Sequence, residues 1–405
     1  MKFCKKSLLC LLVTLLAGAS CGNAGQPASQ PQTTDTVKRV VVGAERANVY
    51  VPLLRGKRIA LLSNQTGMVN DSVHTLDFML AHGLNVTTIF SPEHGFRGTA
   101  DAGERVGSGV DAKTGIPIAS LYDGKRPVPS PETMDRFDVI VVDIQDVGLR
   151  FYTYYITMLH LMNAAAEAGK EFMVLDRPNP NGMTVDGPIL DMRLKSGVGA
   201  LPIPTVHGMT LGELALMING EHWLDDGRTV DLTVVACLNY THSTRYVLPV
   251  APSPNLPCAL AIYLYPSMCY FEGTPLSLGR GTDWPFQVYG HPLMRDHSFT
   301  FTPQSRPGAK KPPLMGQLCH GTSLVGMDPE KAIAQGVNLE YVIDAYRHTP
   351  LGEQFFTPFF DKLMGRRDIK QMIIDGRSAA QIKATWAGDV ARFKAQRRCY
   401  LLYPE

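Results

Sequence analysis

Short apolar runs alternate with longer amphipathic stretches through residues 58–237 of this 405-residue chain. Runs rich in Ile, Leu, Val and Phe predict buried strands, whereas apolar positions spaced three or four apart predict helices. The predicted strands span residues 58–64, 85–90, 137–148, 171–182 and 230–237. The predicted helices lie between them, at residues 72–83, 130–137, 154–170 and 210–220.

Helix boundaries support this division. Ser130 precedes Pro131 and is expected to cap the helix that follows, because proline suits the first helical position. Thr210 and Glu213 have the spacing of a capping box ahead of an apolar run. Gly83 is expected to close the first helix.

Strand and helix alternation of this kind predicts an α/β fold with a mostly parallel sheet and right-handed crossovers. The run at 137–148 is almost continuously apolar, which is typical of a strand covered on both faces. In such sheets, ligands bind beyond the carboxyl ends of the strands.

Polar side chains gather where four successive predicted strands end. Because these ends meet at one edge of a parallel sheet, we expect one shared cleft. The residues are Asn64 and Gln65 after the first strand, Glu93 and His94 after the second, Asp143, Gln145, Asp146 and Arg150 after the third, and Asp176, Arg177, Asn179 and Asn181 after the fourth; His207 stands at a comparable junction.

Two kinds of chemistry fit these groups. A metal site would use Glu93, His94, Asp143 and Asp176 as ligands for a hard ion. Acid–base cleavage of a neutral glycoside would use one carboxyl as proton donor and a second group to activate water or stabilise positive charge. No G-x-G-x-x-G, Walker, H-E-x-x-H or G-x-S-x-G motif is present, so a dinucleotide cofactor is not expected. The residue types alone do not distinguish a metal site from acid–base cleavage of a glycoside.

Eight ordered motifs resemble the NamZ-type exo-β-N-acetylmuramidases, glycoside hydrolase family 171. They are SNQTG, FSPEHGFRG, DIQDVGLRFYTY, LDRPNPNG, DGP, HGMTLGELA, PSPNLP and FEGTPLSLGRGT with the nearby PFQVYG, and the likeness runs from about residue 38 to the C-terminus. The resemblance implies a Rossmann-like domain, here residues 38–245, followed by a smaller α+β C-terminal domain, residues 246–405. It also implies removal of terminal β-linked N-acetylmuramic acid from the non-reducing ends of peptidoglycan fragments, in a cleft between the domains and without a cofactor.

By this resemblance, Glu93 matches the glutamate proposed as the catalytic acid/base. A neighbouring guanidinium would oppose the raised pKa that a proton donor needs, so Arg97 is better suited to bind the lactyl carboxylate of the sugar. Asp143 and Glu272 are the candidates for a second catalytic group. The residues predicted to bind substrate are Asn64, His94, Arg97, Asp146, Arg150, Tyr152, Asp176, Asn179, Asn181, His207, Asn255 and Arg280.

Several of these residues have a structural alternative. Glu93 could form a salt bridge with Arg97 or His94, and Asp146 could cap a turn. Asp176 could hold its loop through backbone bonds. Tyr152 and His207 could be ordinary packed residues, and Asn255 could shape a proline turn.

The N-terminus has the pattern of an export signal. Lys2, Lys5 and Lys6 precede about a dozen apolar residues, and small residues then lead to Cys21. This segment is too short to span a membrane and is typical of a secretory signal. We expect a signal peptide at 1–20, lipidation of Cys21 and a polar tether at 21–37; ordinary cleavage near the same place is the alternative, because Gly18 replaces the usual leucine.

Net charge and cysteine content limit the classes of binding partner and the kind of covalent cross-link that we expect. The net charge of +2 includes no basic cluster, so no nucleic-acid partner is expected. Five widely spaced cysteines follow the tether, and we expect buried free thiols, with one disulfide as the alternative.

The expected protein is exported, anchored by lipid in the cell envelope or secreted, and acts on peptidoglycan fragments. A metal-dependent hydrolase and a non-catalytic muropeptide-binding lipoprotein are the alternatives.

Overall fold

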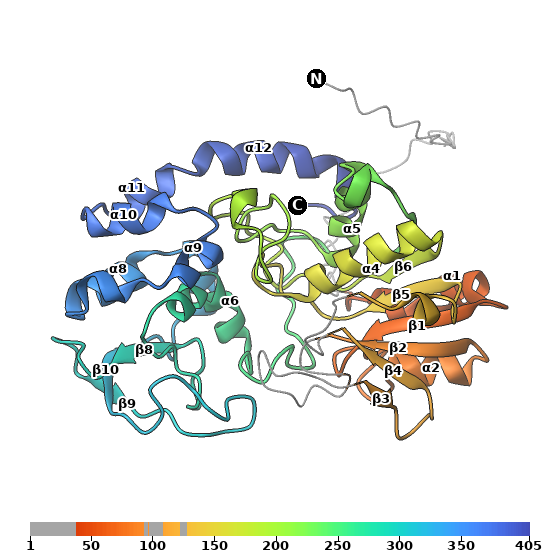
Figure 1. Ribbon diagram of the computed structural model, residues 1–405, viewed down its shortest axis with the longest axis horizontal. Helices are drawn as coiled ribbons and strands as arrows, with labels where there is room; N and C mark the ends of the chain where they lie inside the picture. The colour runs from red at the N-terminus through yellow and green to blue at the C-terminus, as the bar shows by residue number, and fades with distance from the viewer. Residues whose placement is uncertain (1–37, 93–95, 97–107, 122–127) are drawn as a thin grey trace, which may run out of the picture. The chain divides into compact units, whose positions relative to one another are not determined.

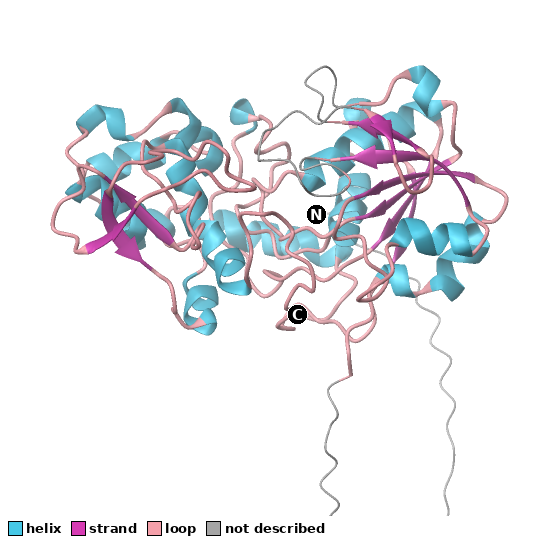
Figure 2. Cartoon of the chain, turned by 90° about the horizontal axis from the view of Figure 1, so that it is seen from below, coloured by secondary structure: helices cyan, strands magenta, loops and turns pink. Residues whose placement is uncertain are grey.

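The apolar runs of the first half form a twisted sheet with helices on both faces (Figures 1 and 2). The computed structural model describes residues 38–92, 96, 108–121 and 128–405. Within them, one sheet has seven strands in the order β3-β4-β2-β1-β5-β6-β7. The strands are β1 Arg58–Ser63, β2 Asn85–Ser91, β3 Gly109–Val110, β4 Pro117–Ser120, β5 Val139–Asp143, β6 Glu171–Leu175 and β7 Asp231–Val235.

All neighbouring strands of this sheet are parallel except β3, which is antiparallel to β4. Counted along the chain, the six parallel strands lie in the order 3-2-1-4-5-6, which is the order of a Rossmann fold. The predicted Rossmann-like α/β class is therefore confirmed.

Alternate residues of each strand face opposite sides of the sheet, because a strand has a side-chain period of two. On β1, Ile59 and Leu61 pack in the same core as α1 (Ala47–Leu54) and α2 (Thr75–Ala81). Ala60 and Leu62 pack on the opposite side, in the core that holds α4 (Tyr154–Ala168) and α5 (Leu211–Gly220). The short α3 (Pro131–Met134) contributes Met134 to that second core.

The second half carries a small antiparallel sheet and most of the helices. Its strands lie in the order β8-β10-β9, with β8 Val288–His291, β9 Phe299–Phe301 and β10 Cys319–Ser323. The helices are α6 Ala259–Met268, α7 Pro329–Gln335, α8 Glu340–His348, α9 Pro358–Met364, α10 Asp368–Ile374, α11 Ala379–Ala384 and α12 Ala387–Arg397. A smaller second part with an antiparallel sheet matches the predicted fold class.

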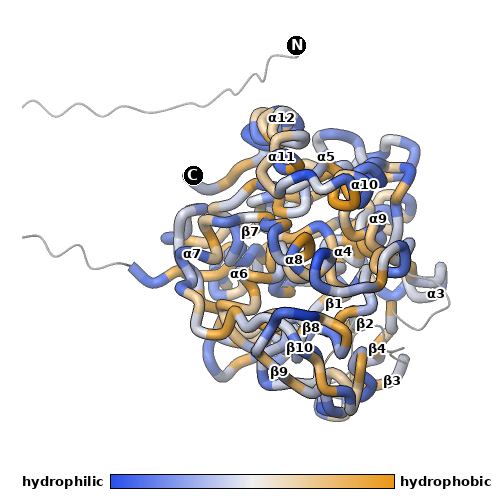
Figure 3. The backbone as a smooth tube through the Cα atoms, turned by 90° about the vertical axis from the view of Figure 1, so that its left-hand side faces the viewer, coloured by the Kyte–Doolittle hydropathy of each residue, from blue (hydrophilic) through white to orange (hydrophobic). Residues whose placement is uncertain are grey.

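One apolar core continues from the first half into the second. Residues of α4 and α5 share it with α6 and with α8 through α12. Hydrophobic segments accordingly recur through the interior of the backbone trace (Figure 3). Residues Val40–Glu405 form a single compact unit. The division into domains at residues 245 and 246 stays a prediction.

Most predicted boundaries of the first half are confirmed, and two are corrected. Ser130 accepts a hydrogen bond from the Thr133 amide, and Thr210 and Glu213 form the predicted capping box. The strand predicted at 137–148 ends at Asp143, and the one predicted at 171–182 ends at Leu175. Both predictions were too long, because residues 144–148 and 176–182 are buried like the strands before them but lie in loops.

Among the described residues, Cys237, Cys258, Cys269 and Cys319 are free thiols. Cys237, Cys269 and Cys319 are buried, which confirms the prediction for these three. Cys258 and Cys399 are exposed, so for them the prediction of burial was wrong. Within the described part of the chain, no helix is long and apolar enough to cross a membrane.

Candidate active site at the strand ends

The sheet reverses its winding between β1 and β5. From β1 the chain continues outward to β2 and β4, and from β5 it continues to β6 and β7 on the other side. Ser63 and Asp143 are neighbours in register at the carboxyl ends of these two strands. Because adjacent crossovers diverge there, this point is where open α/β sheets bind their ligands.

Asn64 follows β1 and links it to the start of α4. Its side-chain amide donates to the Tyr154 hydroxyl at 2.9 Å, and its side-chain oxygen accepts from the Thr66 amide at 2.9 Å and hydroxyl at 2.6 Å. The side chain is fully buried. Asn64 thus fixes the geometry of the switch point, and its predicted contact with substrate stays a prediction.

Asp143 ends β5 in a buried ion pair. Its two oxygens accept from the Arg177 guanidinium at 2.6 and 3.0 Å, and one of them also accepts from the Thr75 hydroxyl. Both partners of the pair are almost inaccessible to solvent. Both carboxylate oxygens of Asp143 are therefore bonded to protein donors. Its predicted catalytic role stays a prediction.

Asp146 has a different environment. One carboxyl oxygen accepts from the Gly148 amide at 2.7 Å, and the other has no hydrogen-bond partner among the described residues. Burial raises the pKa of Asp146 to about 7, against a usual value of 3.8. The turn needs glycine at 148, since its φ is +75° and a Cβ would overlap the Asn179 side chain. Asp146 can therefore hold or release a proton near neutral pH.

Two tyrosines join the switch point to the second half. The Tyr152 and Tyr154 hydroxyls donate to the Pro252 carbonyl oxygen at 2.9 and 3.2 Å. Further along the same PSPNLP segment, Asn255 donates to the Gly308 carbonyl at 2.7 Å and is buried. The structure thus brings residues 252–255 to the ends of β1 and β5.

Asp176, after β6, is fully buried and bound by three donors. They are the Thr210 hydroxyl at 2.6 Å, the Gly212 amide at 2.8 Å and the Tyr403 hydroxyl at 2.6 Å. Burial raises its pKa to about 6. With both oxygens bonded, Asp176 joins β6 to the start of α5 and to residue 403.

Three further predicted residues lie in the loops beside Asp176. Asn179 donates to the Met209 carbonyl and accepts from the Asn181 amide, while Asn181 donates to the Val147 carbonyl, so both amides hold loops together. Burial lowers the pKa of His207 to about 3, and its Nε2 has no partner among the described residues. His207 is therefore neutral at physiological pH.

Arg150 lies apart from these groups in the core. Its guanidinium donates to the carbonyls of Pro188 and Ile203 and to those of Leu363 and Met364, at 2.5 to 3.1 Å. The side chain is fully buried, and its burial lowers the pKa. The contacts found here are structural, and the predicted contact with substrate stays a prediction.

Glu272 and Arg280 pair with each other. The guanidinium donates to Glu272 at 2.6 Å and lies over the Phe286 ring at 5.0 Å. Both side chains keep partial exposure, 25% for Glu272 and 18% for Arg280. The pair is open to solvent, unlike that of Asp143 and Arg177, but no contact shown here joins it to Asp146.

Glu93, His94, Arg97 and Cys21 lie outside the described residues. Phe96, from the same sequence motif, is described and is buried against His74, with ring centroids 5.2 Å apart. Because the His74 Nδ1 accepts from the Leu76 amide, its Nε2 carries the proton and donates to the Asn64 carbonyl at 2.8 Å. Phe96 is thus packed beside the end of β1.

Sequence reasoning missed several residues that complete these groups. Thr75 and Tyr403 carry no local signal, because the first opens an ordinary helix and the second is separated from Asp176 by 227 positions. Arg177 stands among the strand-end residues, but only the fold shows that it pairs with Asp143 rather than with the adjacent Asp176.

The predicted metal site loses two of its ligands. All carboxylate oxygens of Asp143 and Asp176 are bonded to protein donors, and Asp143 is already neutralised by Arg177. A hard ion needs oxygens that are free to face it. This arrangement favours the glycosidase chemistry over the metal-dependent alternative.

Comparison with known proteins finds matches to one family in both halves of the chain. The family model for the N-terminal part of exo-β-N-acetylmuramidase NamZ matches residues 59–259, and the model for its C-terminal part matches residues 263–403. The peptidoglycan β-N-acetylmuramidase NamZ of Bacillus subtilis (strain 168) is 38% identical in an alignment that covers 96% of this chain and 95% of that protein.

Two solved structures from Bacteroides fragilis NCTC 9343, both of DUF1343 family proteins, share the fold. One is 56% identical with a TM-score of 0.85 and covers 91% of this chain and 100% of its own. The other is 29% identical with a TM-score of 0.77 and covers 90% of this chain and 99% of its own. With both halves matched in order, the chain belongs to the exo-β-N-acetylmuramidase NamZ family.

Proposed function

We propose that this chain is an exo-acting glycoside hydrolase that releases terminal β-linked N-acetylmuramic acid from the non-reducing ends of peptidoglycan fragments. The match of both NamZ family models, together with the B. subtilis relative named a peptidoglycan β-N-acetylmuramidase, carries this proposal. The fold adds a ligand-binding switch point with buried polar groups at the matching strand ends.

We assign the catalytic roles as follows. Glu93, by the family resemblance, donates a proton to the leaving oxygen. Of Asp143, the last residue of β5, and Asp146, three residues later, we assign the assisting role to Asp146. Asp146 has an unbonded oxygen and a pKa of about 7, whereas Asp143 is bound on both oxygens. General acid–base groups work best when their pKa lies near the working pH.

The test is release of nitrophenolate from para-nitrophenyl β-N-acetylmuramide. We expect turnover by the wild type, no effect of a chelator at 25 °C, and a loss of about 10²- to 10⁴-fold in Glu93→Gln. Glu132→Gln serves as the matched control, because Glu132 is an exposed carboxylate on α3.

Two outcomes would count against the proposal. Loss of activity with chelator, restored by added metal, would favour the metal-dependent hydrolase. Absence of turnover with retained binding of muropeptides would favour the non-catalytic binding protein.

We also propose that the protein is exported and anchored to a membrane by lipid on Cys21. The basic start, apolar run and small residues before Cys21 support this, and residues 22–36 would form the tether. Labelling of cells with an alkyne fatty acid should mark the wild type and leave Cys21→Ser unlabelled and released from membranes. Equal membrane association of the two forms would contradict the anchor.

A further inference from the structure

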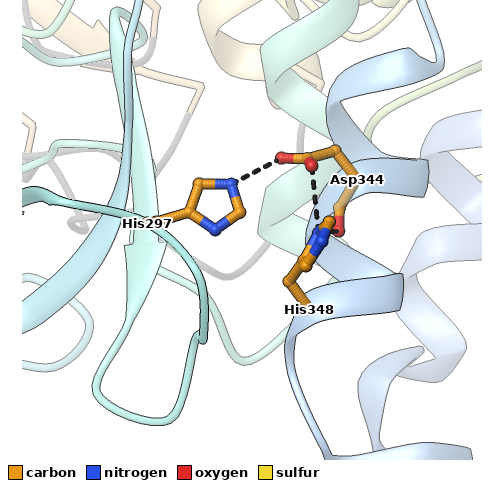
Figure 4. Close-up of side chains that lie close together, drawn as sticks. All are labelled: His297, Asp344 and His348. Carbon is orange, nitrogen blue, oxygen red and sulfur yellow. Dashed lines mark hydrogen bonds and ion pairs between the residues drawn. The ribbon is translucent and has the colours of Figure 1, made fainter.

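Two histidines and an aspartate meet on the surface of the second half, away from the strand ends. His297 lies in the loop between β8 and β9, and Asp344 and His348 lie one turn apart on α8. Figure 4 shows both imidazole rings turned toward the Asp344 carboxylate. One ligand atom from each of the three residues lies within 4.8 Å of the others.

Both histidines have a ring nitrogen fixed by a backbone carbonyl. His297 Nδ1 lies 2.6 Å from the Arg295 carbonyl oxygen, and His348 Nδ1 lies 2.9 Å from the Asp344 carbonyl oxygen. A carbonyl oxygen only accepts, so the His297 Nδ1 carries a proton. A histidine that ligates a metal is usually oriented in this way, with its other nitrogen, here Nε2, free for the ion. The His348 Nδ1 also lies 3.1 Å from the Asp344 carboxylate, so an ion bound there would take the place of its proton, with the ring proton moving to Nε2.

The contact between the His297 ring and the Asp344 carboxylate therefore lacks a proton donor. The His297 Nε2 lies 3.1 Å from an Asp344 carboxylate oxygen. In a neutral ring that nitrogen is a lone pair, so two acceptors face each other. A cation between them, either a proton on the ring or a metal ion, is needed to make the contact favourable.

The carboxylate itself is held in place. The Tyr289 hydroxyl donates to Asp344 at 2.7 Å, and the Tyr289 ring is buried and stacked on Phe271 with centroids 4.7 Å apart. Such outer partners orient a ligating carboxylate. The site remains reachable, because the side chains of Asp344 and His348 are 32% and 36% exposed.

We propose that His297, Asp344 and His348 bind a divalent transition-metal cation of the Zn²⁺ class. Zinc takes histidine nitrogen and carboxylate oxygen at about 2.0–2.2 Å, which places neighbouring tetrahedral ligands about 3.3 Å apart. The His297 Nε2 and the His348 Nδ1 each lie 3.1 Å from an Asp344 carboxylate oxygen, which is close to that spacing. The imidazole donors disfavour Mg²⁺ and Ca²⁺, which take oxygen ligands.

Three protein ligands leave a fourth position for water. The ion would join the β8–β9 loop to α8, beside the existing hydrogen bond from the Arg295 amide to the His348 carbonyl. No strand-end residue takes part, so this site is independent of the proposed hydrolase activity. Its consequence is stability of the second half.

Titration calorimetry of the metal-free protein with ZnCl₂ and MgCl₂ tests the site. We expect one Zn²⁺ per chain, no Mg²⁺ binding and a higher melting temperature with zinc. Tyr289→Phe should weaken zinc binding by about 10- to 100-fold, as expected for loss of an outer partner. His297→Gln and His348→Gln should each weaken it by more than about 100-fold, because they remove a ligand itself.

His82→Gln is the matched control, since His82 is exposed on α2 and lies outside the cluster. All variants are made with Cys258 and Cys399 replaced by serine, because exposed thiols can also bind zinc. Absence of zinc binding in that background overturns the proposal. Equal binding by the wild type and both histidine variants does so too, and the cluster is then an ion pair only.

Discussion

The charge of Asp146 depends directly on the fold. Its pKa rises to about 7 because burial disfavours the ionised form, whereas an aspartate in the unfolded chain titrates near 3.8. Below about pH 4 the carboxyl is protonated in both states. Between about pH 4 and 7 only the unfolded chain releases the proton, so this residue makes the free energy of unfolding fall as pH rises, and the effect levels off above pH 7.

Asp146→Asn removes this pH dependence, because asparagine does not titrate. Between pH 5 and pH 8 the wild type should lose about 2 kcal/mol of unfolding free energy relative to the variant, as measured by urea denaturation. The exposed Asp71→Asn is the control and should track the wild type. Parallel curves for the wild type and Asp146→Asn would show that the carboxyl is ionised in the folded protein.

The sequence identifies the acidic residues of the candidate site but does not show which hydrogen-bond donors each one meets. Asp143, Asp146 and Asp176 all follow strands and look alike in the sequence. The fold pairs Asp143 with an arginine, bonds Asp146 to the Gly148 amide and surrounds Asp176 with three donors. The difference depends on residues that lie tens to hundreds of positions away, which a local pattern does not contain.

At the scale of elements, α5 begins with a cap that serves two purposes. The Thr210 hydroxyl accepts from the Glu213 amide, as in any capping box, and also donates to the buried Asp176 at 2.6 Å. Thr210→Ala should therefore cost about 2–4 kcal/mol, since it removes the cap and leaves a buried carboxylate with one donor fewer.

Ser378 caps α11 with the same type of box but lies at an exposed helix start. Ser378→Ala should cost only about 0.5–1 kcal/mol. Chemical denaturation of both variants gives the comparison. Equal costs would mean that the bond to Asp176 adds nothing beyond ordinary capping.

Elements with a clear period were predictable, and those without one were not. β1, β2, β5, β6 and β7 are apolar runs between capped helices, and each was expected. β3 and β4 are short and lie in a Gly-rich stretch, and β3 is exposed at the sheet edge, so no apolar run marks them. The three-stranded sheet of the second half is equally short, because its strands have three to five residues.

At the scale of the whole molecule, the continuous core predicts that residues 40–405 unfold together. Apolar side chains of α4 and α5 pack in the same core as α6 and α9, and Arg150 bonds to the carbonyls of Leu363 and Met364. A fragment of residues 38–258 would expose this core to water, which is unfavourable by about 25 cal/mol for each Å² of apolar surface.

Calorimetry of residues 38–405 should therefore show one main transition, and the 38–258 fragment expressed alone should show none. Co-expression with residues 259–405 is the control and should restore solubility if the two pieces need each other. Two well-separated transitions in the intact chain would instead mean that each half is stable by itself.

The contact between Tyr403 and Asp176 sets an order for folding during synthesis. The Asp176 carboxylate and the Glu213 carboxylate receive donors from Tyr403 and from the amides of Leu402 and Tyr403. A ribosome makes these acceptors more than 180 residues before it makes their donors. The Rossmann-like half therefore emerges with two acids incompletely bonded, and their hydrogen bonds are completed only when residues 402 and 403 dock.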